Sequence, residues 1–413
     1  MKRTKLALTS SAIIISGILV RLIYILNTSV FERTHDVGTY TDLSDSLINP
    51  GHLGYIEYIA KFGHLPDFDP FKLFSYYHPP LHHILSAIVV KISSLFTDSV
   101  DTCFENVQYL VLAFSAATLI IAYFFLKELA TKDWQVVAGL LLFTFHPSLI
   151  YMSAYVNNDM LTIMFEALGL YFTVKWIKTY RFKYLILMAF ALGFGMCTKI
   201  SAVVIAIPMG VLMLMHLIDE AKEKRAWRCI REYAWFALIS IGLGLSWTVR
   251  NIIRFSTKPG IASATPDDIK YMGDYSIWQR LTIPGNWGFD YPFHNEYGSV
   301  SDNAWLILFK TSIFGEIRPD ISPESVIWFQ AALIAAIIAG LGLTALTIWV
   351  IIREIRRGDR TIGIFMLSGY LAIMLSYIAF VIKYPYTCSC DFRYIAIVLL
   401  FGGAAIGRMR KYE

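Results

Sequence analysis

The sequence predicts an all-α polytopic membrane protein, and three observations carry this prediction. Hydrophobic residues make up 56% of the 413 positions, charged residues only 16%, and the mean hydropathy is +0.54. A soluble domain typically carries about 25% charged residues. Apolar runs of about 20 residues, each long enough to cross a bilayer, recur along the chain. These features exclude a soluble globular protein, a disordered chain and an outer-membrane barrel. The net charge of +5 gives no reason to expect a nucleic-acid partner.

Eleven apolar segments follow one another, and we expect about ten of them to be transmembrane helices. The segments are 7–27, 81–97, 107–126, 134–152, 160–177, 184–198, 201–218, 233–253, 326–352, 361–382 and 392–407. The basic start and long apolar run of the first segment indicate an uncleaved span with a cytoplasmic N-terminus.

Segment 81–97 is the exception among the eleven. Its apolar residues, from Leu81 to Phe96, recur every three or four positions, and histidine, serine and lysine occupy most of the opposite face. Such an amphipathic helix is expected to lie flat in the membrane interface. The alternative, a short span lined with polar residues, would invert the orientation of everything that follows.

The distribution of charge favours the flat helix. With ten spans, the predicted cytoplasmic pieces hold 21 Lys and Arg against 9 Asp and Glu, as the positive-inside rule requires. These pieces are 1–6, 127–133, 175–183, 219–232, 353–360 and 408–413. The topology places both termini in the cytoplasm of a multi-pass plasma-membrane protein. It also requires a turn after 184–198, which brings Lys199 to the outer surface.

Three regions follow from this topology. Residues 1–253 form a membrane module that includes the outer loop 28–80, and residues 326–413 supply the C-terminal spans. Residues 254–325, rich in Gly, Pro, Trp and Tyr, are expected to form an ordered extracytoplasmic loop.

The cysteines suggest no zinc site, because Cys388 and Cys390 are too close together and have no second pair. A disulfide between one of them and Cys103 is one possibility if all three face an oxidising compartment.

Polar residues from several distant segments are predicted at one level near the outer surface. They are His35, Asp36, His78, His146, Asn158, Asp159, Lys199, Arg250, Asn251, Asp391 and Arg393. Ionisable residues close to membrane spans are costly and often functional. Taken singly, each also fits an ordinary role as a helix cap or a headgroup anchor. Their convergence indicates a site.

A carboxylate beside cations at a membrane surface suits sugar transfer from a lipid phosphate. Asp36 could act as the general base that removes the proton of an acceptor hydroxyl. Lys199 and Arg393, with His78, could hold the phosphate and stabilise it as a leaving group. His35, Asn158, Asp159 and Arg250 are weaker candidates for the same site.

The ordered motifs resemble those of GT-C-fold glycosyltransferases, in the branch of protein O-mannosyltransferases and lipid A aminoarabinose transferases. The first span is followed by an acidic residue, Asp36, and then by His78-Pro79-Pro80-Leu81 at the start of the amphipathic helix. The stretch 147–159, the turn 193–199 ending in Thr-Lys, and the segments 247–251 and 392–394 resemble later family elements.

The resemblance implies a polyprenyl-phosphate-linked sugar donor, bound from the lipid bilayer, and a catalytic role for Asp36. The acceptor could be a protein, a glycolipid or a cell-wall polymer. The family usually has Glu after this Asp, whereas Val37 stands here. No cofactor is implied. Related oligosaccharyltransferases use a divalent ion, so Asp36 with Asp159 leaves a small possibility of a metal.

Two other functions fit parts of the sequence. A flippase or transporter of lipid-linked sugars would show midplane charges, broken helices and inverted repeats; the sequence has no visible repeat. A catalytically degenerate GT-C partner subunit is the second, because of the missing Glu.

Overall fold

The structure, a computed structural model, describes residues 2–32, 47–257, 271–282, 291–294, 303–316 and 321–409. Nearly all of them lie in helices, turns or connecting loops, and their only β-type contact is an isolated bridge between Tyr271 and Tyr386. The all-α prediction is therefore confirmed.

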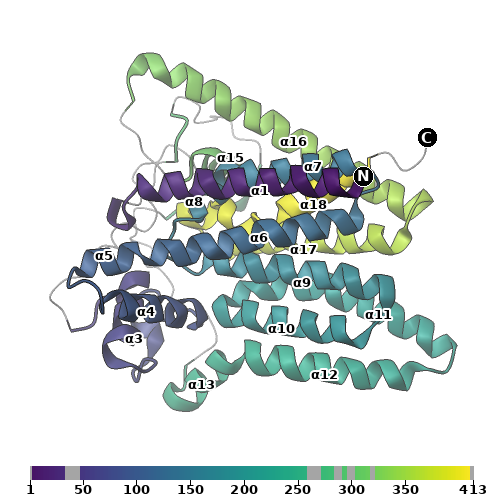
Figure 1. Cartoon of the computed structure of the whole chain (residues 1–413), viewed down its shortest axis with the longest axis horizontal. Helices are drawn as coiled ribbons and strands as arrows, with labels where there is room; N and C mark the ends of the chain where they lie inside the picture. The colour runs from purple at the N-terminus through teal and green to yellow at the C-terminus, as the bar shows by residue number, and fades with distance from the viewer. Residues whose placement is uncertain are drawn as a thin grey trace.

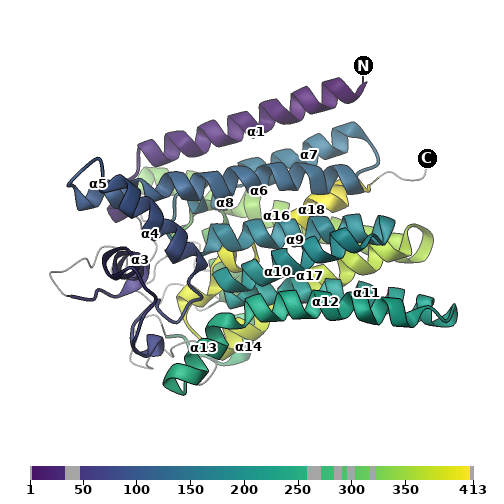
Figure 2. The same ribbon diagram turned by 60° about the horizontal axis from the view of Figure 1, so that its bottom comes forward.

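The α-helices form a bundle of roughly parallel and antiparallel rods (Figures 1 and 2). They are α1 (Lys2–Leu26), α3 (Gly51–Phe62), α4 (Leu81–Ser93), α5 (Val100–Glu105), α6 (Val107–Leu129), α7 (Asp133–Phe145), α8 (Pro147–Met152), α9 (Asp159–Thr179), α10 (Phe182–Thr198), α11 (Ala206–Lys222), α12 (Ala226–Gly244), α13 (Ser246–Phe255), α14 (Ile277–Leu281), α15 (Ala304–Phe314), α16 (Val326–Arg357), α17 (Arg360–Lys383) and α18 (Val398–Gly407). Short 3₁₀ helices connect them: η1 (Val30–Glu32), η2 (Pro70–Lys72), η3 (Ile200–Ile205), η4 (Pro323–Ser325), η5 (Thr387–Cys390) and η6 (Phe392–Ile395).

The chain is a multi-pass membrane protein. Within the described ranges, seven helical segments are long and apolar enough to cross a membrane, and the bent pair α12–α13 makes eight. The helices α7 and α10 are shorter, at 13 and 17 residues. The lengths and hydropathy of the described helices therefore support seven or eight spans, and the expected count of ten is not confirmed. The start of α1 and the end of α18 lie at one end of the bundle, and α3, α4, α5 and α13 lie at the other, which we call the loop end (Figure 1).

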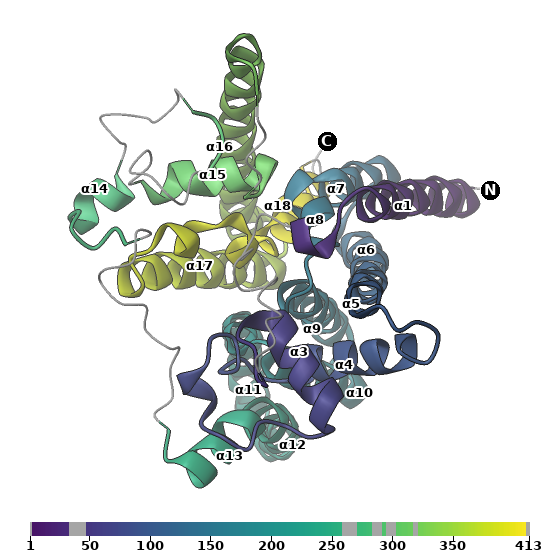
Figure 3. The same cartoon turned by 90° about the vertical axis from the view of Figure 1, so that its left-hand side faces the viewer.

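The helix predicted to lie flat is α4, and it lies crosswise over the loop end (Figure 3). It ends at Ser93 instead of continuing to residue 97. Its polar face is turned into the protein, where His82 and His83 are fully buried. Leu95 and Phe96, just beyond its end, are 77% and 84% exposed. Polar residues inside and apolar residues outside suit contact with lipid rather than water.

Two segments expected as single spans are broken. Segment 134–152 divides into α7 and α8, because Pro147 holds His146 in an extended conformation before the new helix starts. Segment 233–253 bends by 52° between α12 and α13. No proline marks this bend, but the indole of Trp247 in α13 donates to the Tyr77 carbonyl at 3.2 Å. A tertiary contact of this kind is not visible in hydropathy.

The last span also begins differently from the prediction of a helix over 392–407. Two 3₁₀ turns, η5 and η6, precede α18, and the Asp391 side chain accepts a hydrogen bond from the Arg393 amide at 2.7 Å. The local cap of Asp391 therefore competes with α-helix at this point.

The region 254–325 contains a buried helix that sequence interpretation missed. This helix, α15, is apolar, and Asn303 caps it by accepting from the amides of Trp305 and Leu306. Its 11 residues are too short to stand out as a span. All five cysteines are free thiols, so the structure contains no disulfide between Cys103 and Cys388 or Cys390.

A buried ion network fastens the bundle at the end opposite the loop end. Glu354, near the end of α16, has no exposed surface and accepts from Arg408 and Arg353, each at 2.8 Å. Arg408 also donates to the Leu129 carbonyl at 3.2 Å, and Arg353 to the Met409 carbonyl at 2.8 Å. The network joins α16, α6 and the segment after α18.

Replacing Glu354 with Gln should lower the thermal stability of the protein in detergent. The change leaves two buried guanidinium groups without their anion, and breaking a buried pair costs about 3–5 kcal/mol. Asp219→Asn is the control, since it removes an exposed pair with Lys222 that is worth about 0–1 kcal/mol. Equal shifts in Tm for the two variants would show that the network does not stabilise the bundle.

Candidate active site

Three charged side chains from distant parts of the sequence meet at the loop end. Asp159 begins α9, Lys199 follows the last residue of α10, and Arg393 lies in η6. The Lys199 ammonium pairs with one oxygen of the Asp159 carboxylate, and the Nε atom of Arg393 lies 3.7 Å from the other. The exposed fractions of these side chains are 14% for Lys199, 7% for Asp159 and 8% for Arg393. We call these three residues the ion cluster.

The turn before α9 sets the position of Asp159 relative to Lys199. The Asn157 side chain accepts from the Asp159 amide at 3.0 Å, and Asn158 donates to the Thr198 carbonyl at 3.1 Å. The second bond ties the start of α9 to the end of α10. The amino terminus of α9 also favours a negative charge at Asp159. Asn158 is thus a positioning residue for the cluster.

Tyr394 is a member of the site to which sequence interpretation gave no role. Its ring centroid lies 4.9 Å from the Lys199 ammonium and 4.9 Å from the Arg393 guanidinium carbon. Its hydroxyl accepts from Arg393 at 3.0 Å. An aromatic face in contact with two cations offsets part of the cost of placing them together. His146, predicted near this level, stacks on Phe392 with 4.8 Å between ring centroids.

A row of aromatic rings joins α3 to the start of α4 at the loop end. The ring centroids of His78 and His52 are 5.4 Å apart, and those of His52 and His83 are 5.2 Å apart. His52 Nδ1 and His83 Nε2 share a hydrogen bond of 3.0 Å. The Tyr55 ring stacks on His83, with 4.3 Å between the ring centroids. His78 therefore belongs to this row of rings, and Asp159 acts electrostatically on His82, the neighbour of His83, by raising its pKa against the larger effect of burial.

Burial keeps His82 and His83 neutral. It lowers the pKa of His82 from 6.5 to about 3, with a smaller contribution from His52 and an opposing one from Asp159. Burial likewise holds the pKa of His83 well below its usual value, and His52, His82 and His78 add to this effect. Neutral imidazoles beside the two cations of the cluster avoid further repulsion.

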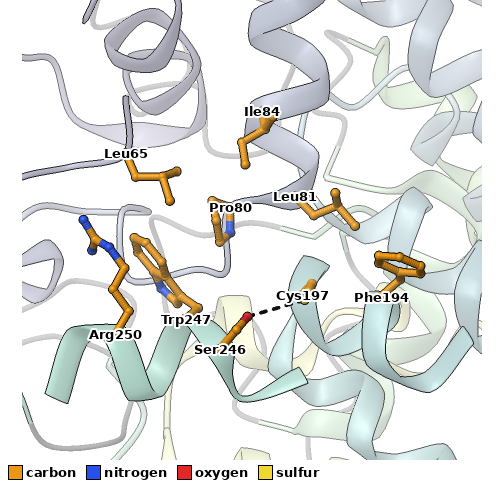
Figure 4. A pocket seen from close by; sticks show the side chains of 9 residues that line it. All are labelled: Leu65, Pro80, Leu81, Ile84, Phe194, Cys197, Ser246, Trp247 and Arg250. Atoms are coloured by element: carbon orange, nitrogen blue, oxygen red, sulfur yellow. Dashed lines mark hydrogen bonds between the residues drawn. The ribbon is translucent and has the colours of Figure 1, made fainter. Parts of the chain in front are cut away.

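Arg250 takes part in a separate feature, a pocket of about 280 Å³ (Figure 4). Its guanidinium donates to the Pro66 carbonyl and to Asn251, and it packs 4.8 Å from the Trp247 ring centroid. The pocket lies between α13, the end of α10 and the start of α4, and apolar side chains form most of its wall. Its lining residues are Leu65, Pro80, Leu81, Ile84, Phe194, Cys197, Ser246, Trp247 and Arg250. Cys197, which lines this pocket, precedes Lys199 by two positions in the chain.

Asp36 and His35 lie outside the described residues, so their predicted roles stay predictions. Within the described parts of the chain, no group of three or more His, Cys, Asp or Glu side chains is arranged to hold a metal ion. Because the pairing considered for a metal included Asp36, the expectation of no metal also stays a prediction.

The cluster can bind an anion. Two cations against one carboxylate leave a formal charge of +1, held in a largely buried position where electrostatic interactions are strong. Arg and Lys are the usual protein partners of phosphate. A phosphate group could reach both cations only beside Asp159.

Comparison with known proteins confirms the family resemblance over part of the chain. Residues 77–247 match the family model of dolichyl-phosphate-mannose-protein mannosyltransferases. This segment contains His78, Asp159 and Lys199, whereas Asp36 and Arg393 fall outside it. Comparison with curated proteins gave no match.

Among solved structures, the chain is similar to the S. cerevisiae protein O-mannosyltransferase Pmt1-Pmt2 complex bound to the sugar donor. The identity is 17% and the TM-score 0.41, over 68% of this chain and 37% of that one. It is also similar to ArnT from Cupriavidus metallidurans bound to undecaprenyl phosphate, with 14% identity and a TM-score of 0.39, over 86% of this chain and 71% of that one. The chain thus spans little more than a third of the length of the first.

Acidification should destabilise the loop end through its buried histidines. In the unfolded chain the imidazole of His82 has a pKa near 6.5, whereas in the folded protein its pKa is about 3. Its contribution to stability is therefore present above pH 6.5 and is lost, by about 1.4 kcal/mol per pH unit, as the pH falls. We expect a lower Tm at pH 5 than at pH 7.

His82→Gln should reduce this difference in Tm, and His64→Gln, a control at an exposed histidine, should leave it unchanged. Identical pH profiles for wild type and His82→Gln would contradict the assignment.

Proposed function

We propose that this protein is a glycosyltransferase that moves a sugar from a polyprenyl-phosphate donor to an acceptor hydroxyl at the extracytoplasmic face of the plasma membrane. The observation that carries the proposal is the ion cluster, in which two cations from different helical segments converge at the loop end. The match of residues 77–247 to a mannosyltransferase family supports it.

The proposed reaction is a single displacement at the anomeric carbon. The acceptor hydroxyl attacks this carbon, and Asp36 takes the hydroxyl proton as the new C–O bond forms. The bond between the anomeric carbon and the phosphate oxygen breaks, and its electron pair leaves with the phosphate. Lys199 and Arg393 stabilise the negative charge that develops there.

The other site residues are assigned supporting roles. Asp159 and Asn158 position the cations, and His78, His35 and Arg250 are candidates for contacts with the donor. The apolar pocket beside α13 is of the kind that an isoprenoid chain could enter. The acceptor is a protein, a glycolipid or a cell-wall polymer.

Asp36→Asn should abolish most of the transfer while leaving donor binding intact. A general base contributes about 10²–10⁴-fold to the rate. Lys199→Met and Arg393→Met should weaken donor binding as well as turnover. The measurement is transfer of labelled sugar from a polyprenyl-phosphate donor by purified protein in lipid vesicles, with thermal unfolding as the test of folding.

The control is Lys222→Met, a loss of one exposed cation at the other end of the bundle. If folded Asp36→Asn transfers sugar at the wild-type rate, Asp36 is not the base. Binding without turnover in the wild type would identify a degenerate partner subunit. Donor crossing the bilayer unchanged would identify a flippase.

A further inference from the structure

We infer that Asp159 makes the site discriminate against a doubly charged lipid phosphate, and that it thereby promotes release of the spent carrier. This inference rests on the proposed function, which defines the two lipid phosphates concerned. It assigns Asp159 a role beyond holding the two cations in place.

The two lipids differ by one negative charge. A sugar-linked polyprenyl phosphate is a phosphodiester and carries one negative charge. When its bond to the sugar breaks, the phosphate keeps the electron pair and becomes a monoester. The second pKa of a phosphate monoester is about 6, so the product carries nearly two negative charges at neutral pH.

The ion cluster suits the first of these ligands better than the second. The ionised Asp159 carboxylate repels any phosphate that contacts Lys199 and Arg393. It repels the dianionic monoester about twice as strongly as the monoanionic phosphodiester, in a cluster whose side chains are less than 15% exposed. Without Asp159, two cations would face a dianion and would hold the product firmly.

The position of Asp159 makes this repulsion unavoidable. Its two carboxylate oxygens face the two cations separately, one paired with Lys199 and the other 3.7 Å from the Arg393 Nε atom. A phosphate that contacts both cations must therefore lie close to the carboxylate. Glu166, a buried acid two turns along α9, is present in both the wild type and the Asp159 variant, so the comparison of these two proteins with the same ligand isolates the effect of Asp159.

The test compares a lipid phosphate monoester with its methyl diester. Binding of farnesyl phosphate and of farnesyl methyl phosphate is measured in detergent at pH 8 for the wild type and for Asp159→Asn. The substitution removes one unit of repulsion for the diester and two for the monoester. We expect affinity to rise on the order of tenfold for the diester and on the order of a hundredfold for the monoester.

The pH supplies an internal control. At pH 5 the monoester carries a single negative charge. The substitution should then raise its affinity by the same factor as that of the diester. In steady state, Asp159→Asn should also show a burst of about one product per enzyme followed by slow turnover, because release of the carrier becomes limiting.

The matched control is Glu128→Gln near the end of α6, where Glu128 faces the end of α9 that is remote from Asp159. Glu128 is likewise shared between two cations, Lys175 and Lys178, each at 2.9 Å. Its loss should change neither affinity. Should Asp159→Asn fail to fold, Asp159→Ser supplies a second neutral side chain, and Asp159→Glu should keep the wild-type selectivity.

The outcomes separate this inference from the proposed function. If Asp159→Asn changes both affinities by one factor at pH 8, or weakens both, Asp159 only positions the cations and the inference is wrong. If Lys199→Met and Arg393→Met also leave both affinities unchanged, the ion cluster does not bind lipid phosphate and the proposed function loses its support.

Discussion

The pairing of Asp159 with Lys199 and Arg393 is the constraint on which the loop end depends. Two cations that are nearly buried repel each other and lose hydration, so they can lie together only beside an anion and polar or aromatic neighbours. Asp159 supplies the anion and Tyr394 supplies an aromatic face. The pairing therefore fixes three chain segments at one level: the start of α9, the end of α10 and the turn before α18. Asn158 helps to hold the start of α9 beside the end of α10, because its side chain donates a hydrogen bond to the Thr198 carbonyl.

The second constraint is that lipid, not water, surrounds part of the loop end. The helix α4 buries its histidines and leaves apolar side chains outside, an arrangement that would be unstable in water. Its buried face places His83 against His52 and Tyr55 of α3, and His82 within electrostatic reach of Asp159. The same orientation thus provides both the contact with the bilayer and the neutral wall of the site. Because imidazoles of depressed pKa add no charge, the cluster keeps its own balance.

Sequence patterns predicted the features that depend on local chemistry. The turn at Lys199 followed from charge and hydropathy, and the flat helix followed from its periodicity. The break between α12 and α13 was not predicted from hydropathy. No proline marks it, although Gly244 and Ser246 flank it, and the contact of Trp247 with Tyr77 joins residues 170 positions apart. The helix α15 was missed because it is short and lies in a region that is polar on average. The stacking of His52 on His83 was missed for a related reason, since only the tertiary structure brings α3 to α4.

The charge of the ion cluster involves a compromise between two steps of the proposed reaction. Stronger positive charge would stabilise the leaving phosphate better and speed bond cleavage. The same charge would bind the product more tightly, and turnover would then be limited by release. A carboxylate placed between the two cations lowers both effects, but it acts more strongly on the dianionic product than on a transition state in which the second charge is only partly developed. Asp159 therefore weakens stabilisation of the transition state to some extent but weakens binding of the product more. Faster release of the product is a reason for such an enzyme to bury an acid where it binds an anion.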